Sequence, residues 1–228
     1  MASIETGKSD RAGRALHGTR WYAAADAIVF AGVLNLLVVV FTLAGGVVLG
    51  WAPALAAATA CTRRRLRGDT VAVVRTFART WSRGFAHANL LLAPPGVALA
   101  LCATSLLALR DRPGATPLVV ALWIALGICG AHLVLTLTMD AHYELGRRQC
   151  LRLAWTFLLR FPGAPLLLVA TTALVVVATM LVPGLLPVLS VGAWISLCTA
   201  LCLSFYAANE RALDGGRQPR PVHPTSIQ

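Results

Sequence analysis

The chain has 228 residues, of which 57% are hydrophobic and only 13% are charged, with a formal net charge of +11 and a mean hydropathy of +0.72. This apolar content exceeds the about 45–50% that is typical of soluble domains, so it indicates a membrane protein. The positive charge lies in clusters at the ends of apolar runs, which argues against a nucleic-acid-binding surface and is typical of a bilayer protein.

Residues 1–22 form a basic segment with no apolar core. Its cations are Lys8, Arg11, Arg14 and Arg20. The apolar run that follows is longer than the about 7–15 residues of a signal-peptide core. We therefore predict that residues 1–22 are a retained cytoplasmic tail.

The first apolar block extends from Asp26 to Cys61, which is too long for one spanning helix. Gly45 and Gly46 lie near its middle, where a turn would divide it into two short segments, 26–44 and 46–61. The block ends at a dense basic cluster, Arg63, Arg64, Arg65 and Arg67. Such a junction is typical of a membrane segment that stops at the cytoplasmic surface.

A basic amphipathic helix is predicted over residues 68–86. Apolar residues follow helical spacing at Val71, Val74, Ala78, Trp81 and Phe85. A separate stripe at i, i+4 and i+8 is basic: Arg75, Arg79 and Arg83. This pattern suits a helix that lies at an anionic membrane surface.

Four further apolar segments are each close to the about 20 residues that a spanning helix needs. They are 88–109, 118–139, 164–186 and 188–208. A second basic interfacial helix is predicted over 145–160, and residues 209–228 are predicted to be a disordered tail.

The distribution of Lys and Arg favours six membrane segments with both termini in the cytoplasm, because a single first span would place a basic cluster outside. A re-entrant segment over 46–61 is the alternative, since it obeys the same charge rule. The predicted fold class is thus all-α: a polytopic helical membrane protein with one membrane domain, residues 23–208.

Polar side chains within the apolar segments are candidates for a solute path. They are Asn35, Asn89, His132 and Thr136. Hydrogen bonding between helices is the alternative, because an unsatisfied polar group in hydrocarbon costs several kcal/mol. The chain contains no recognisable hydrolase, nucleotide-binding or metalloprotease motif, and its six cysteines are scattered. We therefore expect no catalytic residue, cofactor or metal.

Several short elements then occur in a fixed order: an Asn-Leu pair in the first span, a small-residue stretch, a basic stop and a helix with spaced aromatics. The residues are Asn35, Gly50, Pro53, Gly68, Phe77, Trp81, Phe85 and Asn89. This order resembles the YesL-type family of bacterial membrane proteins. The chain departs from that pattern where Trp51 and Ala52 separate a glycine and a proline that are usually adjacent.

YesL-like proteins have no assigned activity and are typically encoded beside carbohydrate ABC importers, and the missing catalytic motifs predict that this chain is not an enzyme. The resemblance implies an accessory or assembly partner of a carbohydrate ABC uptake system in the bacterial cytoplasmic membrane. Contacts to transporter subunits or anionic lipid headgroups are expected at Arg63, Arg64, Arg65, Arg67, Arg75, Arg79 and Arg83. The alternative function is a small-solute carrier or channel with a path near Asn35, Asn89 and His132.

Overall fold

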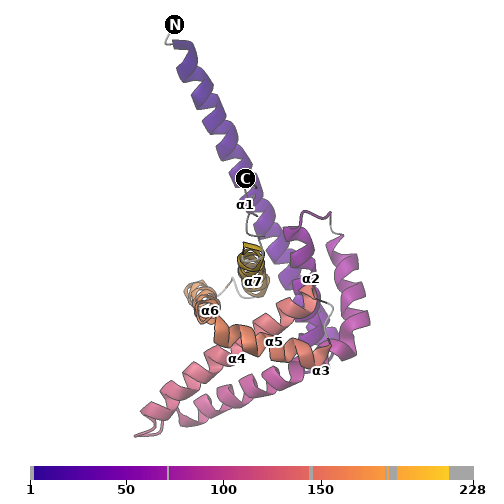
Figure 1. Cartoon of the computed structure of the whole chain (residues 1–228), viewed down its shortest axis with the longest axis vertical. Helices are drawn as coiled ribbons and strands as arrows, with labels where there is room; N and C mark the ends of the chain where they lie inside the picture. Colours follow the sequence, from indigo (N-terminus) through magenta and orange to yellow (C-terminus); the bar gives the residue numbers. More distant parts are fainter. Residues whose placement is uncertain (1–2, 71, 144–145, 183, 185–188, 216–228) are drawn as a thin grey trace, which may run out of the picture.

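A computed structural model describes residues 3–70, 72–143, 146–182, 184 and 189–215, with only the backbone described for 3–21, 209–210 and 212–215. Every regular element in these residues is a helix (Figure 1). The helices are α1 Ser3–Ala44, α2 Trp51–Leu66, α3 Val73–Leu109, α4 Thr116–His142, α5 Arg147–Arg160, α6 Gly163–Leu181 and α7 Val191–Gly215.

Five of the described helices are long and apolar enough to cross a bilayer, so the chain is a multi-pass helical membrane protein. The spanning stretches are Tyr22–Ala44, Val73–Leu109, Thr116–His142, Gly163–Leu181 and Val191–Ala208. The predicted count of six is not reached, because α2 has 16 residues and a length of about 24 Å, which is less than the about 30 Å of a hydrocarbon core. The first span was predicted to be short but has 23 residues.

The C-terminal helix is longer than predicted. α7 continues to Gly215, so residues 209–215 are helical rather than disordered, and residues 216–228 lie outside the described residues. Extending a formed helix avoids the cost of nucleation, and residues 210–213 (Glu-Arg-Ala-Leu) are good helix formers. The predicted segment 164–186 ends earlier, since α6 stops at Leu181.

Glycines end α1 and α2 in the same way. Gly46 has a φ of 76°; its N–H donates to the carbonyl of Leu43 (3.0 Å), and the N–H of Val47 donates to Thr42 (2.9 Å). Gly68, with a φ of 85°, ends α2 with the equivalent pair of bonds. These are Schellman caps, which need a left-handed residue that glycine supplies without steric cost. They place α2 between two sharp changes of chain direction.

α1 and α2 approach each other closely at their shared turn. A Cβ atom on Gly50 would lie 2.2 Å from the carbonyl oxygen of Thr42, and one on Gly45 would lie 2.4 Å from the Cα of Gly50. Only hydrogen fits at these two positions. The absence of side chains here therefore permits the tight α1–α2 hairpin.

α3 combines two elements that the sequence predicts as separate, the basic helix 68–86 and the span 88–109. It starts only at Val73, after the Gly68 stop, and Val71 lies outside the described residues. Pro94 and Pro95 are inside the helix and cannot donate backbone hydrogen bonds, which weakens it locally. The ribbon of α3 changes direction along its length, and its second part lies against α4 (Figure 1).

α2 is the central helix despite its shortness. On one side, Ala52 joins a buried cluster with Leu92 of α3 and Leu135 of α4. On the other side, Ala57 joins a second cluster with Phe77 of α3, together with apolar residues of α1. Small side chains on both faces of α2 let its neighbours pack closely. α2 thereby sets the position of the first part of α3, which carries the basic stripe.

Candidate functional site: a basic groove between α2 and α3

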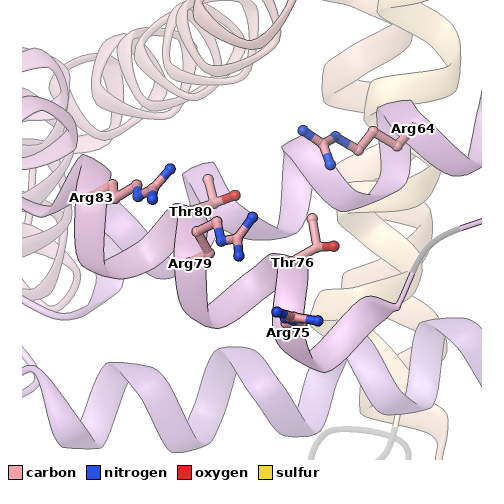
Figure 2. Close-up of a pocket in the computed structure, with 6 residues that line it drawn as sticks. All are labelled: Arg64, Arg75, Thr76, Arg79, Thr80 and Arg83. Atoms are coloured by element: carbon pink, nitrogen blue, oxygen red, sulfur yellow. The ribbon is translucent and has the colours of Figure 1, made fainter.

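A cavity of about 400 Å³ lies between the end of α2 and the first part of α3. Its lining residues are Arg64, Arg75, Thr76, Arg79, Thr80 and Arg83, and we call it the basic groove. Figure 2 shows the guanidinium group of Arg64 extending from α2 toward the row of side chains on α3. The groove therefore has two walls supplied by two different helices.

The opposite face of α3 determines which way the basic stripe points. Phe77 is completely buried, and its ring lies 5.1 Å from that of Phe41 on α1. Trp81 packs on Phe41 at 5.2 Å and on Phe85 at 5.1 Å. Because these aromatic rings are held against α1, the residues on the other side of α3 face the groove.

The three consecutive arginines at the end of α2 have different roles. Arg63 donates to the carbonyl oxygens of Ala141 and His142, the latter at 3.5 Å, and so links α2 to the end of α4. A cation is favourable at that position, because the last carbonyls of a helix carry partial negative charge. Burial lowers the pKa of Arg63, as do the neighbouring positive charges of Arg67 and Arg64.

Arg65 is bound on the other side of α2. It forms an ion pair with Asp26 of α1 at 2.6 Å, and its guanidinium group lies 4.2 Å from the ring centroid of Phe30. Arg64, between these two structural arginines, points into the groove. None of the ion pairs between described residues includes a groove arginine. Four cations thus face one cavity without a carboxylate partner in the described part of the chain.

Asn35 is completely buried, and it caps a helix that lies far away in the sequence. Its Oδ1 atom accepts hydrogen bonds from the backbone N–H groups of Val191 (3.0 Å) and Gly192 (3.3 Å), at the start of α7. The first N–H groups of a helix have no partner within it, so an outside acceptor is needed. A Cβ atom on Gly192 would lie 2.0 Å from the carbonyl oxygen of Ala31, so α1 and α7 are in close contact here.

Asn89 also bonds to backbone groups. Its Nδ2 atom donates to the carbonyl oxygens of Leu49 and Phe85, both at 2.9 Å. The first of these bonds links α3 to the turn between α1 and α2. The side chain therefore stabilises the hairpin that positions the groove.

His132 and Thr136 hold α5 against α4. The Nε2 atom of His132 lies 3.3 Å from the carbonyl oxygen of Leu151, and its ring packs on Trp155 at 4.6 Å. The hydroxyl of Thr136 donates to the carbonyl of His132 at 2.8 Å, and the thiol of Cys150 donates to the carbonyl of Thr136. Burial raises the pKa of Cys150 to about 12, and the negative charge of Asp140 contributes to this rise.

The eight motif residues are placed mainly at helix junctions. Beyond the caps and contacts above, Pro53 is buried in the first turn of α2, where a missing N–H costs little. None of the eight lines the basic groove. The motif residues thus contribute to the packing of α1, α2, α3 and α7, whereas the groove is lined by other residues of the same region.

Sequence reasoning missed three features near the groove. Thr76 and Thr80 line it. Each directly follows an arginine of the basic stripe, Arg75 or Arg79, and this spacing of four residues could have identified them. His87 of α3 pairs with Asp140 of α4 at 2.8 Å. This pair lines a smaller cavity of about 180 Å³ that shares Thr80 with the groove. No sequence pattern predicts this pair, because 53 residues separate its members.

Comparison with known proteins gives one family match. A model described as "Protein of unknown function, DUF624" matches residues 32–106, which are 75 of the 228 residues. The matched region contains α2, most of α3 and every residue of the basic groove. No curated protein and no solved structure matches the chain. The match supports an uncharacterised domain family and carries no activity with it.

Proposed function

We propose that this protein is a non-enzymatic accessory or assembly partner of a carbohydrate ABC uptake system in the bacterial cytoplasmic membrane. The observation that carries the proposal is the basic groove, whose exposed arginines are held in a fixed direction yet form no ion pair within the described chain. The YesL-type resemblance supplies the kind of partner.

The charge distribution supports a cytoplasmic location for both termini and for the groove. The basic cluster of α2, the stripe on α3 and the arginines of α5 can lie on one side of the bilayer together with both tails. That arrangement follows the positive-inside rule, with only Arg110 and Arg112 on the other side. It requires the short helix α2 to bring the chain back to the side on which the first span begins, and the ion pair between Arg65 and Asp26 supports such a return. On this orientation, the groove faces the cytoplasmic surfaces of transporter subunits and the anionic headgroups of the inner leaflet.

Gentle affinity purification from native membranes of cells grown on plant polysaccharide tests the proposal. We expect ABC permease subunits to be recovered in stoichiometric amounts, as identified by mass spectrometry. Recovery of this protein alone would contradict the accessory role.

A charge variant tests the docking surface. Replacing Arg75, Arg79 and Arg83 with Gln should lower the yield of the complex, because complementary charge contributes to association. The control variant Arg110→Gln/Arg112→Gln alters the opposite end of the membrane domain and should leave the yield unchanged. An equal yield from the triple variant and the wild type would refute docking through α3.

The carrier alternative gains no support from the polar residues on which it depended. Asn35, Asn89, His132 and Thr136 all bond to backbone groups of the chain itself. The cavities described in this structure are lined by other residues.

A further inference from the structure

We infer that the basic groove is a binding site for a phosphate monoester, carried either by a lipid headgroup or by a soluble phosphorylated molecule. This inference goes beyond the accessory role and does not depend on it, because the site is complete within one chain. Three features of the groove support it: the donors that line it, the two free hydroxyls among them, and the rigidity of both walls.

The groove offers hydrogen-bond donors and no carboxylate acceptor. Each of its four guanidinium groups presents five N–H donors in a planar fork that matches phosphate oxygens. A neutral sugar needs acceptors as well as donors, so it is a poor match for this lining. A phosphate monoester has three terminal oxygens and a charge of about −1.5 to −2 at neutral pH. It can therefore form charge-assisted hydrogen bonds with more of these arginines than a single carboxylate can.

The hydroxyls of Thr76 and Thr80 are free to bind a ligand. Within the described chain, neither hydroxyl forms a hydrogen bond. Several other helical threonines, such as Thr104, Thr136 and Thr171, donate to the carbonyl one turn earlier, as hydroxyls in helices commonly do, whereas the hydroxyl of Thr62 is also unbonded but is buried outside the groove. Two unbonded hydroxyls between arginine side chains, as drawn in Figure 2, add donors of the kind that phosphate sites use.

The walls of the groove are fixed before any ligand arrives. Arg63 and Arg65 hold the end of α2 against α4 and α1, and the Schellman cap at Gly68 sets where the chain leaves α2. The buried ring of Phe77 holds α3. The four guanidinium groups repel one another in the folded protein, and an anion that binds among them reduces this repulsion. A preformed site of this kind loses little entropy on binding.

The volume of the groove suits more than a bare phosphate ion. A cavity of about 400 Å³ falls within the usual range for small-ligand sites. A second cavity of about 180 Å³ shares Thr80 with the groove, has a mostly apolar lining and is also lined by the His87–Asp140 pair. It gives space for the part of the ligand that carries the phosphate, such as a sugar ring or the glycerol of a lipid.

The test uses the full-length protein purified in detergent, with no transporter subunit present. In the soluble arm, calorimetry measures binding of inorganic phosphate and glucose 6-phosphate, with glucose and glucuronate as comparison compounds. In the lipid arm, delipidated protein is placed in phosphatidylcholine nanodiscs containing either phosphatidic acid or phosphatidylglycerol at equal surface charge. Native mass spectrometry then measures how much of each lipid is retained. We expect binding in one of the two arms, with the phosphate monoester preferred, and the arm that binds identifies the source.

Two variants separate a built site from general attraction to positive charge. Arg64→Gln/Arg79→Gln should weaken the binding about 100-fold, since each charge-assisted bond accounts for about tenfold. Thr76→Val/Thr80→Val keeps both charge and shape and should weaken it about tenfold. The control Arg67→Gln/Arg148→Gln removes two exposed arginines outside the groove and should change the affinity less than threefold.

Three results would overturn the inference: no binding in either arm, no effect of the threonine variant, or an equal loss in the arginine control. Circular dichroism of each variant excludes misfolding as the cause of a loss. Because no partner protein is in the assay, a negative result here leaves the purification test of the accessory role unaffected, and the reverse also holds.

Discussion

Replacement of Asn35 by Leu should destabilise the membrane domain by removing one cap. Leu has the same branching at Cγ and the same number of side-chain heavy atoms as Asn, and it suits an apolar span, so the change removes the Oδ1 acceptor. The N–H groups of Val191 and Gly192, now 3.0 and 3.3 Å from that oxygen, would then lose its hydrogen bonds. Because Asn35 is completely buried, water cannot easily replace it.

The magnitude is worked from the two hydrogen bonds that the Oδ1 atom of Asn35 accepts. Hydrogen bonds between membrane helices contribute about 0.6–1.7 kcal/mol each in mutant cycles, so two of them give about 1–3 kcal/mol. The opposing gain from a more apolar side chain is small, because the site faces backbone N–H groups rather than lipid. We therefore expect the free energy of unfolding to fall by about 1–3 kcal/mol.

Equilibrium unfolding in mixed micelles, followed by circular dichroism, measures this change. The matched control is Leu36→Ala, since Leu36 is the next residue on α1 and is 61% exposed. Truncation there should cost less than the Asn35 variant, because the side chain faces outward. Equal stability of Asn35→Leu and the wild type would show that α7 does not need this acceptor.

Three further predictions concern packing, pH and surface charge. Gly192→Ala should lower the melting temperature in detergent more than Asn35→Leu does, because its Cβ would lie 2.0 Å from the backbone oxygen of Ala31; equal melting temperatures would contradict the close α1–α7 contact. Burial raises the pKa of Cys150 to about 12, so between pH 9 and 12 the unfolded thiol loses its proton while the folded one keeps it, and the free energy of unfolding falls by at most about 1.4 kcal/mol per pH unit. The variant Cys150→Ala should therefore make the stability measured by urea unfolding less dependent on pH in that window. An unchanged dependence on pH would contradict the assignment of this effect to Cys150. Asp26→Asn removes the partner of Arg65 but should lower the free energy of unfolding by less than about 1 kcal/mol in the same urea assay, because Asp26 is mostly exposed. A larger loss of stability would show that the pair is more than a surface contact.

The features that were predictable from sequence depend on local spacing. The apolar segments of about 20 residues, the glycine turn in the first block and the basic stripe at i, i+4 and i+8 are all properties of neighbouring residues. The turn lies where Gly45 and Gly46 predict it, and the stripe lines one wall of the groove. Local spacing also led to the prediction of a membrane segment over 46–61, because the sequence does not show that the helix starts only at Trp51.

The rest depends on contacts between distant residues. Nothing near Asn35 indicates that its amide caps a helix 156 residues later. Three consecutive arginines look equivalent in sequence, yet Arg63 and Arg65 bind α4 and α1 while Arg64 faces the groove. Successive residues of a helix point in directions about 100° apart, so the three arginines reach different neighbours of α2. Only the tertiary structure shows what those neighbours are.

The motif and the groove occupy the same matched region, and this placement connects their roles. Gly50 and Gly68 permit the close approach and the cap that position α2, and Phe77 fixes the rotation of α3. A groove with walls on two helices keeps its geometry only if both helices are held, because a rotation of α3 by one residue would turn Arg79 away from Arg64. The packing motif therefore supports whatever the groove binds, although none of its residues would touch the ligand.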